Sequence, residues 1–112
     1  MITKQGFKIV RRAIDNRLAS PFVFFNSVFY TPNKPTAPVA GHGPLCVFDT
    51  EENARRLMAL GDSPTLEIWR CDYAPSNWTA VWTYPRRDVC PLSDLLEGTR
   101  LADSVTLRHR IS

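Results

Sequence analysis

The sequence has few of the residues that build metal, phosphate or disulfide sites. It contains two histidines, three cysteines and five glycines among 112 residues. The cysteines are far apart and form no C-x-x-C pair, and an odd, dispersed set argues against a disulfide scaffold and for a reducing compartment. A zinc site needs several ligands at close spacing, and a phosphate loop needs clustered glycines. We therefore expect neither a metal nor a cofactor.

Long apolar runs are also missing. The N-terminal segment MITKQGFKIV lacks the apolar stretch of a signal peptide, and no later run is long enough to span a bilayer. Together with the cysteine usage, this pattern predicts a cytoplasmic protein that makes no membrane contact.

The residues that are present suffice for one hydrophobic core. Hydrophobic residues make up 44% of the chain and aromatic residues 11%, and the net charge is only +3, so we expect a folded chain. Its length corresponds to a single globular domain over residues 1–112. The pI near 9.0 weakly favours an acidic partner. The basic residues form dispersed pairs, whereas a dedicated nucleic-acid binder usually carries a denser stripe.

The clearest structural signal is a strand–helix–strand unit in the middle of the chain. Leu45–Phe48 predicts a strand, and Asp49 or Thr50 then offers a side-chain cap for a helix over about residues 50–60. This helix has one apolar stripe, formed by Ala54, Leu57 and Met58. We expect Gly61 to end the helix in a left-handed conformation.

Further strands flank this unit on both sides. Alternating or β-rich segments predict them at residues 7–10, 21–30, 65–73, 79–84 and 104–111. In the last segment His109 shares its parity with the apolar residues, so we expect it in the core. Residues 86–90 are polar and predict irregular structure. The fold class is α+β: a mainly antiparallel sheet of five or six strands packed against one principal helix.

Two irregular segments are candidates for a contact surface. Residues 31–43 are rich in proline, which disfavours both helix and central strand, so they predict a long surface loop. Its candidate partner-binding residues are Asn33, Lys34 and His42. The second segment, residues 74–90, contributes Trp78, Trp82, Arg86 and Arg87.

Aromatic residues and arginines are interleaved in and before the second segment. Such residues can pack in a core, form the centre of a protein interface or stack against nucleic-acid bases. The residues concerned are Trp69, Arg70, Tyr73, Trp78, Trp82, Tyr84, Arg86 and Arg87. No carboxylate pair and no cysteine–histidine pair has a spacing that indicates catalysis, so we assign no catalytic residue.

The order of these segments resembles that of small uncharacterised proteins encoded by bacteriophages and prophages. The resemblance rests on GPLCVFDTEENARRL and TLEIWRCDY in the middle of the chain, with FKIVRR and SPFVF before them and EGTRLADSVTLRHRI at the end. It implies a bacterial host and no particular chemistry.

A more remote resemblance is to the core of ADP-ribosyltransferases. In that family a first strand carries His or Arg, a middle motif carries Ser or Tyr, and a late strand carries Glu. By position, Arg11 or Arg12 and Thr50 match the first two places. Glu97 and Asp103 are the late acidic residues available for the third.

We therefore expect a small, non-enzymatic binding protein of phage or prophage type. Its partner would be a host bacterial protein or ribonucleoprotein complex, and its function the steric inhibition of a bacterial immunity complex, in the manner of anti-CRISPR proteins. An ADP-ribosyltransferase-like enzyme is the first alternative, and a single-stranded nucleic-acid binder is the second.

Overall fold

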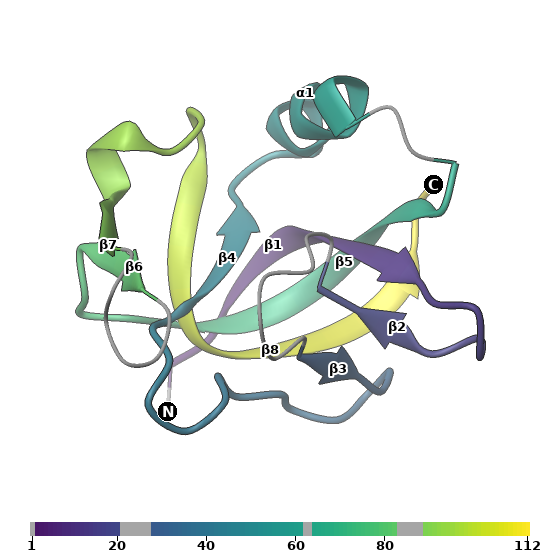
Figure 1. Cartoon of the computed structure of the whole chain (residues 1–112), viewed down its shortest axis with the longest axis horizontal. Coiled ribbons are helices and arrows are strands. Elements are labelled where there is room, and N and C mark those ends of the chain that lie inside the picture. Colours follow the sequence, from purple (N-terminus) through teal and green to yellow (C-terminus); the bar gives the residue numbers. More distant parts are fainter. Residues whose placement is uncertain (1, 21–27, 62–63, 83–88) are drawn as a thin grey trace.

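Four antiparallel strands close on one another to form a barrel-like ring (Figure 1). The computed structural model describes residues 2–20, 28–61, 64–82 and 89–112. Each ring strand is hydrogen-bonded to the next and the last returns to the first, in the order β1 (Lys4–Arg12), β4 (Leu45–Phe48), β8 (Thr99–Arg110) and β5 (Leu66–Pro75). Two short strands extend the sheet beyond β1, namely β2 (Leu18–Ala19) and β3 (Phe29–Tyr30).

The remaining elements lie outside the ring. Helix α1 (Glu51–Gly61) connects β4 to β5, and a separate two-stranded sheet is formed by β6 (Ala80–Trp82) and β7 (Val89–Pro91). A short 3₁₀ helix, η1 (Leu92–Asp94), follows β7. Figure 1 shows α1 above the ring and the β6–β7 pair beside it. The predicted α+β class, with a dominant antiparallel sheet and one α-helix in the described residues, is confirmed.

Alternation along the ring strands separates the core into two clusters. On β1, Val10 belongs to the larger cluster, together with Cys71 and Tyr73 of β5. Its neighbour Ile9 points to the other side and packs with Ile68 in a second cluster. Because successive strand residues face opposite sides of a sheet, β1 and β5 contribute to both clusters, whereas the core residues of β8 belong to the larger one.

Helix α1 belongs to the second cluster through the stripe that its sequence predicts. Ala54 is fully buried against Ile9 and Phe48, and Leu57 and Met58 pack at its edge. The rest of the helix is polar, and two ion pairs between residues four apart, Glu51–Arg55 and Glu52–Arg56, run along its surface.

The ends of the helix differ in detail from the prediction. Thr50 supplies the N-terminal cap, because its hydroxyl accepts a hydrogen bond from the backbone N–H of Asn53 at 3.2 Å. Asp49 instead accepts a bond from the Asn53 side chain at 2.9 Å. Helix α1 ends at Gly61 as predicted, but the predicted left-handed conformation is wrong, because this glycine is the last helical residue and has no positive φ. It permits close packing, since a Cβ there would lie 2.9 Å from Leu66.

Two strand predictions also need correction. Val89 and Cys90 fall in a segment predicted to be irregular, yet they form β7 and pair with β6. His109 is exposed, not buried. The pairing of β5 with β8 shifts register at this point, so that Arg70 lies opposite His109 and Cys71 opposite Leu107. This bulge puts His109 out of phase with the buried residues before it.

Candidate functional site

The predicted contact surface contains a cluster of exposed and half-buried apolar side chains on the β6–β7 pair and just before it. Trp82 lies directly opposite Val89 in the pairing, so their side chains share one face. The Trp78 ring meets the Trp82 ring edge to face, with centroids 4.9 Å apart and planes at 78°. Trp78 is 55% exposed and Val89 is 57% exposed. We name these three residues, Trp78, Trp82 and Val89, the Trp patch.

The proline-rich loop holds the Trp patch in place. The indole N–H of Trp82 donates to the carbonyl of Gly41 at 3.2 Å, and the backbone N–H of Gly43 donates to the carbonyl of Trp82 at 3.0 Å. A Cβ at Gly43 would lie within 2.9 Å of the Trp82 backbone and ring, so only glycine allows this approach. The structure therefore brings together the second half of the loop, including His42, and two of the predicted tryptophans.

The first half of the loop lies elsewhere, against β8. The backbone N–H of Asn33 donates to the carbonyl of Leu107 at 2.8 Å, and Thr36 pairs with Val105. The Asn33 side chain accepts a bond from Arg108 at 3.4 Å, and Lys34 is exposed beside it. In Figure 1 the loop runs from β3 along the lower edge towards the β6–β7 pair. The hydrogen bonds of Asn33 and Lys34 join them to Leu107, Arg108 and Thr31.

Two other predicted residues, Arg86 and Arg87, lie outside the described residues, as does Tyr84. Two more of the aromatic residues that are interleaved with arginines in the sequence have core positions. Tyr73 is buried in the larger cluster, and Trp69 packs against that cluster. The Trp69 indole N–H donates to Glu67 at 3.0 Å. These two rings belong to the core, whereas Trp78 and Val89 of the Trp patch are exposed and Trp82 is half-buried.

Most arginines in the described part of the chain are paired with carboxylates. Ion pairs within 4.0 Å include Arg12, Arg17, Arg55, Arg56, Arg100, Arg108 and Arg110. Paired arginines offer less positive potential to phosphates than unpaired ones would. Single-stranded nucleic-acid binding remains a prediction, and a titration at two salt concentrations would test it.

A second candidate site is a pocket between β1 and β4, where the ring is least closed. Among the described residues, β1 pairs with β4 only through Phe7 and Phe48, whereas its pairing with β5 extends from Lys4 to Arg11. In a regular antiparallel ladder Lys8 would pair with Val47 and Ile9 with Cys46, but among the described residues the β1–β4 pairing does not continue past Phe7 and Phe48. A pocket of about 390 Å³ lies at this seam.

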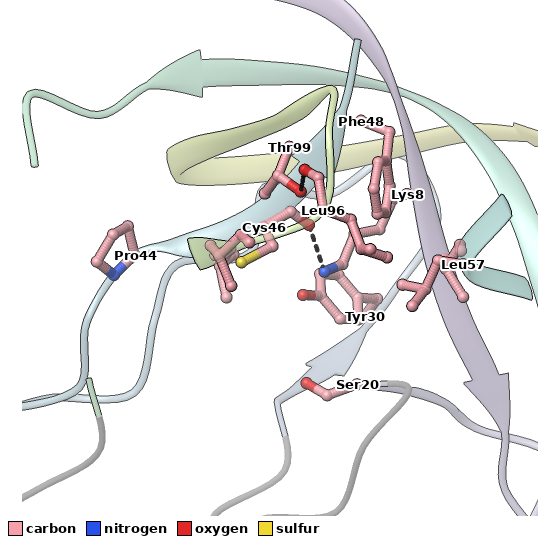
Figure 2. A pocket seen from close by; sticks show the side chains of 12 residues that line it. Lys8, Ser20, Tyr30, Pro44, Cys46, Phe48, Leu57, Leu96 and Thr99 are labelled. Carbon is pink, nitrogen blue, oxygen red and sulfur yellow. Dashed lines mark hydrogen bonds between the residues drawn. The ribbon is translucent and has the colours of Figure 1, made fainter. Parts of the chain in front are cut away.

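Lys8 bridges the seam with its ammonium group, although it is only 6% exposed. Its Nζ donates a hydrogen bond of 2.6 Å to the backbone carbonyl of Cys46 on β4. The same Nζ lies 5.6 Å from the centre of the Tyr30 ring, within the range of a cation–π contact. Figure 2 shows the ammonium between the Cys46 carbonyl and the Tyr30 ring.

Tyr30 lines the same pocket from β3 and is 4% exposed. Its ring packs in the larger cluster, but its buried hydroxyl has no hydrogen-bond partner among the described residues. A buried hydroxyl without a partner costs free energy and calls for an explanation. The remaining walls are mainly apolar and include Ile9, Phe48, Leu57, Leu95 and Leu96.

The two cysteines nearest Lys8 are inert thiols. Burial raises the pKa of Cys46, and it raises the pKa of Cys71 to about 12, although the positive charge of Lys8 opposes both shifts. At neutral pH both thiols are therefore protonated and act as small core residues.

Of the residues matched to ADP-ribosyltransferases, Arg12 and Thr50 make structural contacts, whereas the buried Nε of Arg11 has no hydrogen-bond partner among the described residues. Arg12 makes two hydrogen bonds to Glu67, at 2.9 and 3.0 Å, and Thr50 caps α1. Glu97 lies 3.5 Å from Arg56 on the surface, and Asp103 is exposed on β8. The enzyme alternative remains a prediction, which incubation with labelled NAD would test.

No three His, Cys, Asp or Glu side chains gather into a possible metal site in the part of the chain that the structure describes. None of its helices has the length and apolar character needed to cross a bilayer. Comparisons with protein-family models, with curated proteins and with solved structures gave no match.

The partner-binding prediction did not include Lys8 or Tyr30. A lysine inside the apolar run FKIV is a weak signal that could have pointed to Lys8, since a charged residue on an inward-facing strand position needs a partner. Tyr30 carried no such signal, because its orphan hydroxyl depends on what the fold places around it.

Proposed function

We propose that this chain is a non-enzymatic binding protein that occludes a protein partner through the Trp patch. The observation that carries the proposal is the exposure of Trp78, at 55%, beside a second tryptophan and an exposed valine. Contiguous exposed apolar residues mark interaction surfaces, and tryptophan is among the commonest hot-spot residues of protein interfaces.

The anchoring of the patch supports this role. Trp82 is fixed through its ring and its backbone by Gly41 and Gly43, so the patch loses little conformational freedom on binding. A preorganised pair of rings suits insertion into an apolar cavity of the partner.

The charge of the chain favours an acidic rim around that cavity. The net charge is +3, and the sequence between β6 and β7 includes Arg86 and Arg87. The resemblance to phage and prophage proteins leads us to propose a bacterial immunity complex, such as a CRISPR ribonucleoprotein, as the target in the host cytoplasm. Complementary charge would speed association and select the partner.

The test compares Trp78→Ser with Leu60→Ser, since Leu60 is 72% exposed on α1, away from the patch. We expect immobilised wild-type protein to retain a partner from bacterial lysate, the Trp78 variant to bind that purified partner about 30-fold more weakly, and the Leu60 variant to bind it normally.

The inhibitory function has its own assay. A phage that a CRISPR system targets should form plaques on cells that express the wild-type chain or the Leu60→Ser variant. The phage should form no plaques on cells that express the Trp78→Ser variant. Equal binding of the partner by the Trp78 and Leu60 variants would contradict the role of the Trp patch. A lack of plaques on cells that express the wild-type chain would contradict the proposed immunity target.

A further inference from the structure

The pocket at the β1–β4 seam contains a buried positive charge that has no counter-ion among the described residues. Lys8 is 6% exposed, and in the described part of the chain no carboxylate lies within 4.0 Å of its ammonium group. None of the described residues that line the pocket is acidic. A buried charge is costly unless it is paired, and one carbonyl with one aromatic ring satisfies an ammonium group incompletely.

Part of the hydrogen-bonding capacity of the polar groups in this pocket is also unused. An ammonium group has three donors, and the bond to Cys46 uses one. The Tyr30 hydroxyl is a further buried donor, and it has no partner in the part of the chain that the structure describes. Both groups belong to the lining of one pocket, so a ligand that reaches them would satisfy a charge and a hydroxyl together.

The rest of the pocket is suited to hydrocarbon. Its described walls are largely aliphatic or aromatic, with Leu57 from α1 and Leu95 and Leu96 from the segment after η1. Leu96 is 42% exposed and lies at the rim. A volume of about 390 Å³ is near the lower end of the range for pockets that hold small molecules.

We propose that this pocket binds a small aliphatic monocarboxylate, with the carboxylate on Lys8 and Tyr30 and the chain against the leucine walls. A carboxylate supplies the missing counter-ion and accepts from both donors at once, and such charge-assisted hydrogen bonds are stronger than neutral ones. The hydrocarbon chain removes apolar surface from water on both sides. This site is separate from the Trp patch, and either function can exist without the other.

Octanoate, octanol and octylamine form a matched set of probes, because they share the chain length and differ in the headgroup. In isothermal titration at pH 7 we expect octanoate to bind, octanol to bind at least tenfold more weakly, and octylamine not to bind. Equal affinity for octanoate and octanol would contradict the proposal, since it would show that the ammonium group takes no part.

Two variants test the named donors. Tyr30→Phe removes only the orphan hydroxyl, so the thermal midpoint of the free protein should not fall, while octanoate affinity falls about tenfold. If the Tyr30 hydroxyl were purely structural, the substitution would lower the thermal midpoint and leave octanoate affinity unchanged. Lys8→Met keeps the aliphatic stem and removes the charge, and it should lower octanoate affinity by at least tenfold.

The matched control is Lys34→Met, which removes an exposed lysine from the loop over β8 and should leave octanoate affinity unchanged. If the Lys8 variant fails to fold, the Tyr30 variant and the headgroup series still decide the question. Absence of octanoate binding to the wild-type protein at millimolar concentration would overturn the proposal.

Discussion

Replacing Glu67 with glutamine should destabilise this fold more than any surface charge substitution. Glu67 lies on β5 and is 4% exposed. Its carboxylate accepts two hydrogen bonds from Arg12, at 2.9 and 3.0 Å, and one from the Trp69 indole at 3.0 Å. Arg110 lies 3.7 Å away on the neighbouring strand β8. One buried carboxylate thus joins three strands of the ring, because Arg12 belongs to β1.

The magnitude follows from what glutamine cannot do. A side-chain amide has one acceptor oxygen, so its NH₂ group must face an N–H donor where the second carboxylate oxygen was. The variant loses at least one hydrogen bond to a charged partner, and such a bond contributes about 1.5–3 kcal/mol. We expect the free energy of unfolding to fall by about 2–3 kcal/mol, which lowers the thermal midpoint by about 10 °C in a chain of this size.

The pH dependence provides a second readout. Burial by itself would raise the pKa of Glu67, but the hydrogen bonds from Arg12 and Trp69 and the charges of Arg12 and Arg110 outweigh it, so the pKa is lowered from its ordinary value of 4.5. A lowered pKa in the folded state stabilises the protein above the unfolded pKa. The contribution is lost as the pH falls below about 4.5 and through the folded pKa.

Urea denaturation of both proteins between pH 3 and pH 7 would measure this effect. Because glutamine does not titrate, the difference in unfolding free energy should be largest near pH 7 and shrink as the pH falls. Glu52→Gln is the matched control, since Glu52 pairs with Arg56 on the exposed face of α1, and it should change stability by less than about 0.5 kcal/mol. Equal effects of the two substitutions, or a difference that does not depend on pH, would refute the reasoning.

Three further outcomes are expected. Gly43→Ala should destabilise the protein by about 1–3 kcal/mol and change the near-UV circular dichroism, because the added Cβ would lie within 2.9 Å of Trp82; an unchanged spectrum would contradict that contact. Thr50→Ala should lower the free energy of unfolding, measured by urea denaturation, by about 1 kcal/mol, since it removes the hydrogen bond from the Asn53 N–H to the cap. An unchanged free energy of unfolding would show that the cap does not stabilise the helix. Cys71, whose pKa is raised to about 12, should react with iodoacetamide at pH 8 only after denaturation, and labelling of Cys71 itself in the folded protein would contradict its burial.

Local sequence determined the strand–helix–strand unit in the middle of the chain. The strand Leu45–Phe48 has the predicted bounds, and α1 begins and ends within one residue of the prediction. These elements follow from signals between residues close in sequence: a cap at Thr50, an apolar stripe at helical spacing, and β-rich segments on either side. For the same reason the proline-rich segment was correctly predicted to be a loop.

Tertiary structure decided how these elements close on one another. The return of β5 to β1, which turns a sheet into a ring, depends on contacts between residues far apart in the sequence. The bulge opposite Arg70 and Cys71 shifted His109 from its predicted core position to the surface. Parity along one strand cannot report such a shift, since register is a property of two strands.

The candidate sites show the same division. The sequence predicted a turn region around Trp78, a β-rich segment around Trp82 and a proline-rich loop over residues 31–43, all with residue types found at interfaces. Only the folded chain placed Gly43 against Trp82 and put the Lys8 ammonium and the Tyr30 hydroxyl into one pocket. The physical reason is that composition and periodicity determine which side chains each segment can bury. The unpaired Lys8 charge and the unpaired Tyr30 hydroxyl instead result from the tertiary structure, in which the pairing of β1 with β4 stops.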